Sequence, residues 1–140
     1  MKRFAILCMI YWQSIAHGFD PRIITAQVFV ESSFRPAAVN KQCTGLMQVD
    51  YGVWGKVLGV TRADLLDPWR NIDAGLRVLR IYYRETGDIW KALHRYNNGY
   101  KHNNTRYVPK IKRAMREFYQ APDASRQAPR GVRHTTGDKP

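Results

Sequence analysis

The stretch AQVFVESSF, residues 26–34, sets one carboxylate, Glu31, within an otherwise apolar run. Asp20 and Pro21 stand ahead of this run and suit the N-cap and the first position of a helix. A helix over residues 21–34, ending before Pro36, turns by about 100° per residue. That rotation places Glu31 on one face with Ile23, Ile24, Gln27, Val28 and Phe34. The stretch therefore predicts an acid on the core side of a helix.

A carboxylate on an apolar face has two physical interpretations. Burial without a charged partner raises the pKa of a carboxylic acid and keeps it protonated near neutral pH, as a general acid requires. Alternatively, the carboxylate pairs with Arg or Lys, or reaches water, and has a structural role only. For an isolated stretch the second interpretation is the more common one, so the rest of the chain has to decide.

Length and composition describe one globular domain with a strong positive charge. The chain has 140 residues, of which 24% are charged and 44% hydrophobic, which suits a single domain with its own core. Its net charge of +12 predicts a polyanionic partner. Nucleic acid, an anionic membrane surface and an acidic polymer of the cell envelope all fit, and charge alone does not choose among them.

The two cysteines and the N-terminus each leave two alternatives. Cys8 and Cys43 are too few for a disulfide framework and lack metal-ligand spacing, so they form one bridge or remain two buried thiols. Residues 2–16 have the three-part layout of a secretory signal, yet residues 4–17 also have the spacing of an amphipathic helix that ends at Gly18. The apolar part of this segment is too short to span a membrane.

The remaining periodicity predicts an all-α domain over residues 1–120. No segment has a sustained period of two, and residues 37–44 are expected to form a loop. Asp88 caps one expected helix and Thr105 caps the last. Besides residues 4–17 and 21–34, helices are expected at residues 50–58, 61–66, 71–86, 89–97 and from 105 to about 118. Residues 121–140 are rich in Pro, Ser, Gly, Arg and Lys, which predicts a disordered basic tail.

Several short motifs occur in one order along the chain. They are ESSFRPAAV at residues 31–39, GLMQ at 45–48, NIDAG at 71–75, YNNG at 96–99 and YV at 107–108. Together they resemble the SLT-type lytic transglycosylases, which cut peptidoglycan, and above all the small single-domain members associated with secretion, conjugation or phage entry. The resemblance covers roughly residues 10–118 and implies a lysozyme-like fold of about six to seven short helices.

The resemblance implies that Glu31 is a single general acid and base, with no metal and no cofactor. Such an enzyme cleaves the β-1,4 bond between N-acetylmuramic acid and N-acetylglucosamine and leaves a 1,6-anhydromuramoyl end. Tyr96 would hydrogen-bond Glu31 and orient it. Ser32 and Asn97 would fix the local backbone or contact the substrate.

Three further residues take roles from the same resemblance, each beside a simpler alternative. Gln48 would hold an acetamido or hydroxyl group of a sugar, or satisfy local backbone groups in a buried turn. Met47 would bind substrate, or line the cleft as an apolar residue. Tyr107 would contact substrate, or pack in the core.

The chain departs from the family pattern at three places near the motifs. Gln42 and Cys43 stand where the family has a small Gly-Ala pair, and Arg95 replaces an alanine before the YN pair. Asp50 comes shortly after GLMQ, where a carboxylate is not usual. Ordinary glycosidases use two carboxylates, and the second here could be only Asp50 or Asp73. Asp50 therefore keeps a hydrolytic goose-type lysozyme as the alternative.

The resemblance also implies partners and a place of action. Glycan strands of peptidoglycan in the bacterial cell wall or periplasm are the expected partner, and basic residues would attract their carboxylates. These basic residues are Arg77, Arg80, Lys101, Lys110 and Lys112. Delivery by a phage particle, or by an envelope-spanning secretion or conjugation complex, is favoured over a cleaved signal. A non-catalytic basic module that binds nucleic acid is the remaining rival, but the basic residues are scattered over several expected helices.

Overall fold

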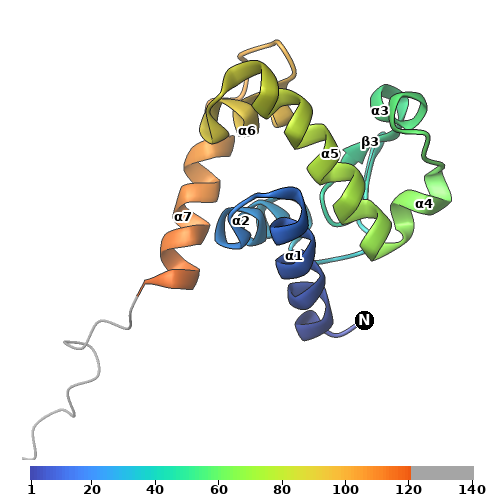
Figure 1. Ribbon diagram of the computed structural model, residues 1–140, viewed down its shortest axis with the longest axis horizontal. Coiled ribbons are helices and arrows are strands. Elements are labelled where there is room, and N and C mark those ends of the chain that lie inside the picture. Colours follow the sequence, from blue (N-terminus) through green and yellow to red (C-terminus); the bar gives the residue numbers. More distant parts are fainter. Residues whose placement is uncertain (121–140) are drawn as a thin grey trace, which may run out of the picture.

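Seven helices and a small three-stranded sheet make up residues 1–120, the part of the chain that the computed structural model describes (Figure 1). The helices are α1 (Arg3–His17), α2 (Pro21–Ser32), α3 (Tyr51–Leu58), α4 (Arg62–Leu66), α5 (Pro68–Thr86), α6 (Ile89–Asn98) and α7 (Tyr107–Tyr119). The strands are β1 (Val39–Asn40), β2 (Cys43–Thr44) and β3 (Val49–Asp50). This content confirms the all-α class. The tail expected at residues 121–140 lies outside the described residues.

The longest helix, α5, is the scaffold of the domain. It packs against α6, α1 and α4, whereas α2 packs against α7 and α1 (Figure 1). Its buried side has the three- and four-residue spacing expected of an amphipathic helix. The buried residues are Asn71, Ile72, Ala74, Gly75, Leu76, Val78, Leu79 and Tyr82. Because α1 packs against both α5 and α2, it links the scaffold helix and α6 to the helix that carries Glu31.

Aspartates start most of the helices, and the sequence predicted this role for Asp20 and Asp88. Asp20, Asp50 and Asp88 each accept a hydrogen bond from a backbone N–H of the first turn of α2, α3 and α6. Asp67 does the same for α5, which begins at Pro68 and so three residues earlier than expected. The expected cap of the last helix was wrong, because α7 has Arg106 at its N-cap and no side-chain cap bond.

The helix that carries Glu31 ends two residues earlier than its pattern predicts. α2 stops at Ser32, and Ser33 and Phe34 take left-handed φ angles of 52° and 60°. Phe34 is therefore not on the helical face, yet it remains buried because its ring packs against Phe29 and Phe118. The sharp turn after α2 leads the chain directly into the sheet.

The segment expected to be a loop contains β1 and β2 of the sheet. The three strands of this sheet pair antiparallel in the order β1-β2-β3. Each strand has only two residues, and a segment of that length is too short to show a period-two pattern in the sequence. Gly45 lies at the turn after β2 with φ 81°, where an added Cβ would lie 2.2 Å from the Asn71 amide and 2.5 Å from the Leu65 carbonyl. Only glycine fits this position.

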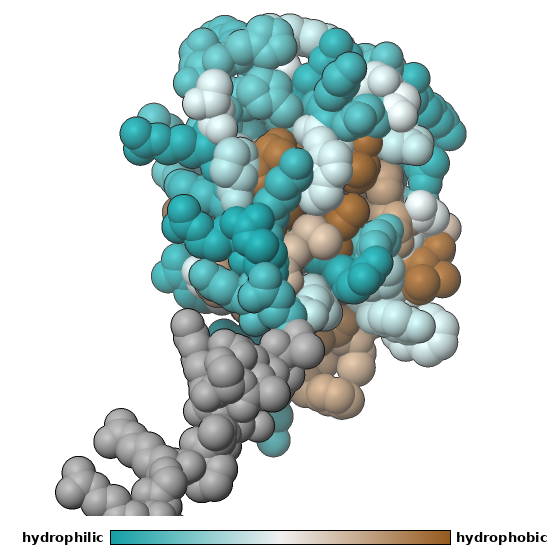
Figure 2. Space-filling view, turned by 90° about the vertical axis from the view of Figure 1, so that its left-hand side faces the viewer, coloured by the Kyte–Doolittle hydropathy of each residue, from teal (hydrophilic) through white to brown (hydrophobic). Residues whose placement is uncertain are grey.

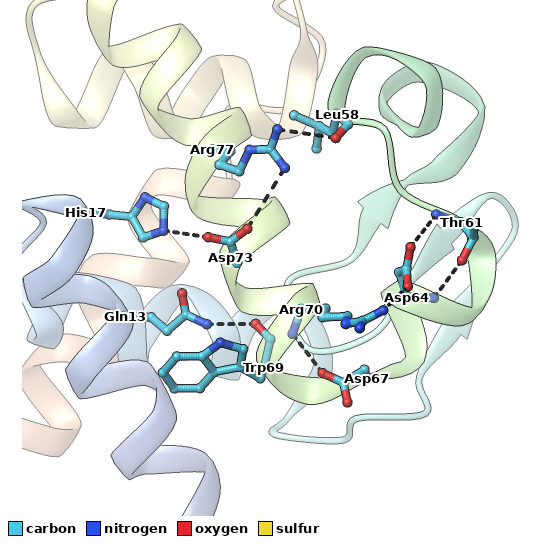
Figure 3. Close-up of polar contacts among 10 residues, drawn as sticks. All are labelled: Gln13, His17, Leu58, Thr61, Asp64, Asp67, Trp69, Arg70, Asp73 and Arg77. Atoms are coloured by element: carbon cyan, nitrogen blue, oxygen red, sulfur yellow. Dashed lines mark hydrogen bonds and ion pairs between the residues drawn. The ribbon is translucent and has the colours of Figure 1, made fainter.

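The first helix belongs to the folded domain. Ile6 and Ile10 are buried, the Gln13 amide donates to the Trp69 carbonyl at 2.7 Å, and His17 Nε2 lies 2.9 Å from Asp73 (Figure 3). In the structure, residues 3–17 form an amphipathic helix that packs on the rest of the domain. None of the helices within residues 1–120 has the length and apolar character needed to cross a membrane.

The two cysteines lie apart from each other in the fold. Cys8 is in α1 and Cys43 in β2, and both are free and partly buried. The structure therefore contains two thiols, and the alternative of a bridge between them was wrong.

Candidate active site

Glu31 lines a cleft in the domain. The cleft has a volume of about 760 Å³ and is lined by residues of α2, the sheet, α3, α5, α6 and the segment after α6. Polar and aromatic side chains share its wall, as in sites that hold a sugar or another amphipathic ligand. Besides Glu31, it contains Gln48, Asp50, Tyr96, Asn97 and Tyr100.

Glu31 lies in the last turn of α2 and has the properties of a proton donor. Burial raises the pKa of its carboxyl group from 4.5 to about 7, and a hydrogen bond from Tyr107 opposes that rise. None of the ion pairs formed by residues 1–120 includes Glu31. The structural interpretation, a carboxylate paired with Arg or Lys, is therefore excluded for this residue.

The hydrogen bond to Glu31 comes from Tyr107, at the start of α7. The Tyr107 hydroxyl donates to Glu31 Oε1 at 2.5 Å and accepts from the side-chain N–H of Gln27 at 3.2 Å. Burial and the Glu31 charge raise the pKa of Tyr107 well above its ordinary value, so the phenol keeps its proton. Tyr107 is 3% exposed, so it packs in the core with its hydroxyl on Glu31.

Tyr96 was expected to make this bond, and its partner was predicted wrongly. Its hydroxyl donates to the Met47 carbonyl at 2.7 Å. Because a phenol has one proton to donate, that bond uses it. Tyr96 still lines the cleft, and burial, followed by the Glu31 charge, raises the pKa of its hydroxyl well above the ordinary value. Its position ties α6 to the backbone of the GLMQ motif.

Met47 and Gln48 differ in what they can reach. Met47 is fully buried and packs against Gly75, where an added Cβ would lie 2.5 Å from its sulfur. It does not line the cleft, so the structure shows neither the substrate contact nor the cleft-lining position expected of it. Gln48 lines the cleft, and its side-chain nitrogen donates to the carbonyls of Ala38 and Gly45 at 3.0 and 2.9 Å. These two bonds satisfy backbone carbonyls of a turn, which is one of the two roles expected of Gln48. They also leave the amide oxygen as an acceptor.

Ser32 and Asn97 make different hydrogen bonds, and only Asn97 lines the cleft. Ser32 is buried and its hydroxyl donates to the Val28 carbonyl at 3.1 Å, so it fixes the last turn of α2. Asn97 lies on the cleft wall, and its side-chain oxygen accepts from the Asn104 amide at 2.9 Å. Asn97 can therefore meet a ligand, whereas Ser32 acts through the backbone.

The two candidates for a second carboxylate are placed differently. Asp73 binds His17 at 2.9 Å and lies 4.0 Å from Arg77, on the side of α5 that faces α1 (Figure 3). It is not among the residues that line the cleft. Asp50 does line the cleft, and one of its oxygens accepts from the Val53 N–H at 3.2 Å as the cap of α3. Asp50 alone keeps the question of a second acid open.

Of the residues that depart from the family pattern, Cys43 and Asp50 line the cleft, whereas Gln42 and Arg95 do not. Cys43 is on its wall, and burial followed by the charges of Asp50 and Glu31 raises the pKa of the thiol. Arg95 pairs with Glu85 at 3.0 Å. Within residues 1–120, no three His, Cys, Asp or Glu side chains gather where they could hold a metal ion.

Sequence reasoning missed two parts of this site. Tyr107 is the hydrogen-bond partner of Glu31 because α7 packs against α2, and the sequence does not show this packing. In the sequence, the only signal for Tyr107 was its place in the YV pair. Tyr100 gave no signal beyond its position after the YNNG motif.

The family follows from the comparison with known proteins. The family model described as the transglycosylase SLT domain matches residues 9–117, close to the range expected from the motifs. The chain therefore belongs to this family, and its helical architecture is that of the lysozyme-like SLT domain.

Three curated relatives show how much of their length this similarity covers. "Membrane-bound lytic murein transglycosylase C" of Photorhabdus laumondii subsp. laumondii is 39% identical over 84 residues, which is 54% of this chain and 24% of the relative. "Transglycosylase" of Enterobacteria phage PRD1 is 35% identical over 95 residues, or 64% of this chain and 35% of the relative. "Membrane-bound lytic murein transglycosylase F" of Vibrio campbellii is 33% identical over 99 residues, or 65% and 18%. The chain thus spans about a third or less of these relatives.

Proposed function

We propose that this chain is a peptidoglycan lytic transglycosylase in which Glu31 is the single general acid and base. The observation that carries the proposal is a glutamic acid with a pKa of about 7, free of ion pairs within residues 1–120, on the wall of a cleft. Such an acid holds its proton at neutral pH and gives it up readily. Membership in the SLT family and the names of the relatives support the same activity.

In the proposed reaction one proton leaves Glu31 and another returns. Glu31 donates its proton to the oxygen between N-acetylmuramic acid and N-acetylglucosamine, and the bond from that oxygen to the anomeric carbon breaks. The acetamido oxygen of the muramoyl residue stabilises the cationic carbon. The ionised Glu31 then takes the proton of the 6-hydroxyl, whose oxygen bonds to the anomeric carbon. Attack within one sugar is entropically favoured, so a second carboxylate is not needed.

The neighbours of Glu31 support both halves of this cycle. The Tyr107 hydroxyl donates to the carboxylate and so stabilises the ionised form that follows the first proton transfer. Tyr96 holds the Met47 carbonyl and with it the backbone that carries Gln48. The free amide oxygen of Gln48 would accept the N–H of an acetamido group, and Asn97 would contact the sugar from the α6 side.

The proposed partner is the glycan strand of the bacterial cell wall, with the wall or periplasm as the place of action. One relative is a phage transglycosylase, which supports delivery by a phage particle, while an envelope-spanning secretion or conjugation complex is the alternative. Figure 2 shows that the face on the side of α7 is largely hydrophilic, in keeping with the exposed Lys110 and Lys112. These charges would attract carboxylates of the stem peptides.

The products of digestion test the proposal. Purified peptidoglycan sacculi are incubated with the full chain, and the released muropeptides are analysed by mass. We expect 1,6-anhydro products, which are lighter than hydrolytic products by one water. Glu31→Gln should abolish release without unfolding the domain, and Glu117→Gln, at an exposed site on α7, is the matched control. Release by Glu31→Gln at the wild-type rate would end the assignment.

A goose-type lysozyme on the same fold is the second candidate. It is favoured by one observation, the carboxylate of Asp50 on the wall of the cleft that also holds Glu31. A second carboxylate could activate water, as in glycosidases that use two acids. Products that retain the added water would support this candidate over the first.

A further inference from the structure

Tyr100, in the segment after α6, is an exposed aromatic residue on the wall of the cleft. Its side chain lines the same cleft as Glu31, although the residue is 69% exposed. An aromatic ring in water is usually free to rotate, and core packing does not hold this one. Three contacts nevertheless fix it.

The first contact fixes the hydroxyl group. Tyr100 donates to the Glu85 carboxylate and lies 2.9 and 3.0 Å from its two oxygens. Glu85 belongs to the C-terminal part of α5, so the bond joins the segment after α6 to the scaffold helix. A bond to a charged acceptor is stronger than one to a neutral acceptor.

The second contact fixes the face of the ring. The Arg95 guanidinium carbon lies 5.4 Å from the Tyr100 ring centroid, within the range of cation–π attraction. The same guanidinium donates to Glu85 at 3.0 Å. Arg95, Glu85 and Tyr100 thus form a closed set of contacts. Arg95 is also one of the positions at which the sequence departs from the pattern that the family resemblance implies.

The third contact joins Tyr100 to other aromatic residues of the cleft. Its ring meets Tyr82 edge-on with centroids 6.2 Å apart, and Tyr82 meets Trp54 in the same way at 5.8 Å. All three residues line the cleft. Tyr82 is 6% exposed and Trp54 is partly buried, so Tyr100, at 69%, is the most exposed ring of this row.

We infer that the Tyr100 ring is a stacking platform for a sugar ring of the glycan strand, held in position by Glu85 and Arg95. This inference rests on the proposed function, because it takes the cleft to be a saccharide site. Sugar rings have an apolar face of C–H groups that packs on an aromatic plane. A ring that is already fixed loses little conformational entropy when the sugar binds, and this raises affinity. Tyr100 is therefore a binding residue, and Glu85 and Arg95 are positioning residues.

The binding test uses the chain with Glu31→Gln, which cannot turn over the ligand. The probe is the uncharged tetramer of N-acetylglucosamine, with affinity measured by calorimetry. Adding Tyr100→Ala should raise Kd by about five- to tenfold, as expected for truncation of an aromatic anchor. Tyr100→Trp keeps a stacking surface and should stay within about twofold of the parent, and Arg95→Ala, which only frees the ring, should raise Kd by about two- to threefold. Tyr11→Ala, at a half-exposed tyrosine on α1, is the matched control with no change.

A kinetic test separates binding from folding and chemistry. With active enzyme, Tyr100→Ala should raise KM and leave kcat unchanged, and the melting temperature is measured alongside to show that the variant is folded. Equal Kd for the parent and the Tyr100→Ala variant would overturn the platform and leave the proposed function intact. Binding of a single-stranded oligonucleotide in place of the tetramer would also overturn it. Loss of anhydro products from wild-type digestion is the separate result that overturns the proposed function.

Discussion

The Tyr107 hydroxyl lies 2.5 Å from Glu31 Oε1, so the first residue of α7 touches the last turn of α2. The two residues are 76 positions apart in the chain. Gln27, one turn before Glu31, donates to the same hydroxyl at 3.2 Å. Its own side-chain oxygen is buried and has no hydrogen-bond partner among the described residues. The Gln27 N–H therefore turns the Tyr107 proton towards the carboxylate, and the acid is oriented from within the core.

The first prediction concerns this bond. Glu31 must be protonated to act, so kcat/KM should fall as pH rises above about 7. Tyr107→Phe removes a donor that stabilises the ionised form and holds the pKa down. The falling limb of the pH profile should therefore move to higher pH. The maximal rate should drop by about tenfold, because the ionised intermediate loses a charge-assisted bond.

A tyrosine away from the cleft provides the comparison. Tyr11→Phe removes a hydroxyl from the exposed side of α1. It should leave both the falling limb of the pH profile and the maximal rate unchanged. Tyr107→Phe also leaves Gln27 without its partner, so the melting temperature of each variant should be measured alongside. An unshifted pH profile in a folded Tyr107→Phe protein would contradict the positioning role.

The second prediction uses stability, which does not depend on any substrate. The pKa of Glu31 is about 7 in the folded chain and near 4.5 when the group is exposed. The folded state binds more protons than the unfolded state between these values, so wild-type stability falls as pH rises from 4.5 to 7. Glu31→Gln lacks this titration. Its free energy of unfolding relative to wild type should rise between pH ~4 and pH ~8 by on the order of 3 kcal/mol.

Urea unfolding at these two pH values measures the difference. Glu117→Gln, at an exposed position of α7, is the control, with little change relative to wild type at either pH. If the Glu31→Gln difference is the same at both pH values, Glu31 is not held in a setting that favours its neutral form. The proton source of the proposed reaction would then be lost.

The sequence predicted what depends on neighbouring residues along the chain. The burial of Glu31 follows from the period of α2, and the starts of α2 and α6 follow from Asp20 and Asp88 just before them. The contacts around Glu31 depend on how distant elements cross. Two tyrosines, Tyr96 and Tyr107, stand in motifs, and only the packing of α7 on α2 decides which of them reaches the acid.

Adjacent residues of the GLMQ motif show the same limit. Met47 and Gln48 are neighbours, but Gln48 takes a φ of 49°, which no periodic pattern predicts. With that turn Met47 enters the core beside Gly75, while Gln48 stays on the cleft wall. Similarly, the strands β1, β2 and β3 are held by tertiary contacts and not by an alternating pattern. The anchor of this segment is Asn71, from α5.

Asn71 carries the third prediction. It is fully buried, its side-chain oxygen accepts from the Met47 N–H at 2.8 Å, and its nitrogen donates to the carbonyls of Thr44 and Leu65 at 2.8 Å each. Asn71→Ala leaves three backbone groups without partners. It should lower the free energy of unfolding by about 3 kcal/mol or more. Thermal or urea unfolding measures this, and Asn103→Ala, at an exposed position, should change it by less than about 0.5 kcal/mol. A small effect at Asn71 would show that the sheet does not depend on this side chain.

The fourth prediction decides whether a second carboxylate takes part. Asp73 faces His17 and Arg77 and does not line the cleft, so Asp73→Asn should keep wall-degrading activity within about twofold of wild type.

Asp50 lines the cleft, and Asn caps a helix as well as Asp does, so Asp50→Asn preserves α3 and removes only the charge. If Glu31 works alone, Asp50→Asn should also stay active and still release 1,6-anhydro products, because the 6-hydroxyl of the sugar replaces water as the nucleophile. A folded Asp50→Asn protein that loses activity by about a hundredfold or more would show instead that Asp50 activates water, since removal of a general base has an effect of that size. The wild-type products would then carry the extra water of a lysozyme.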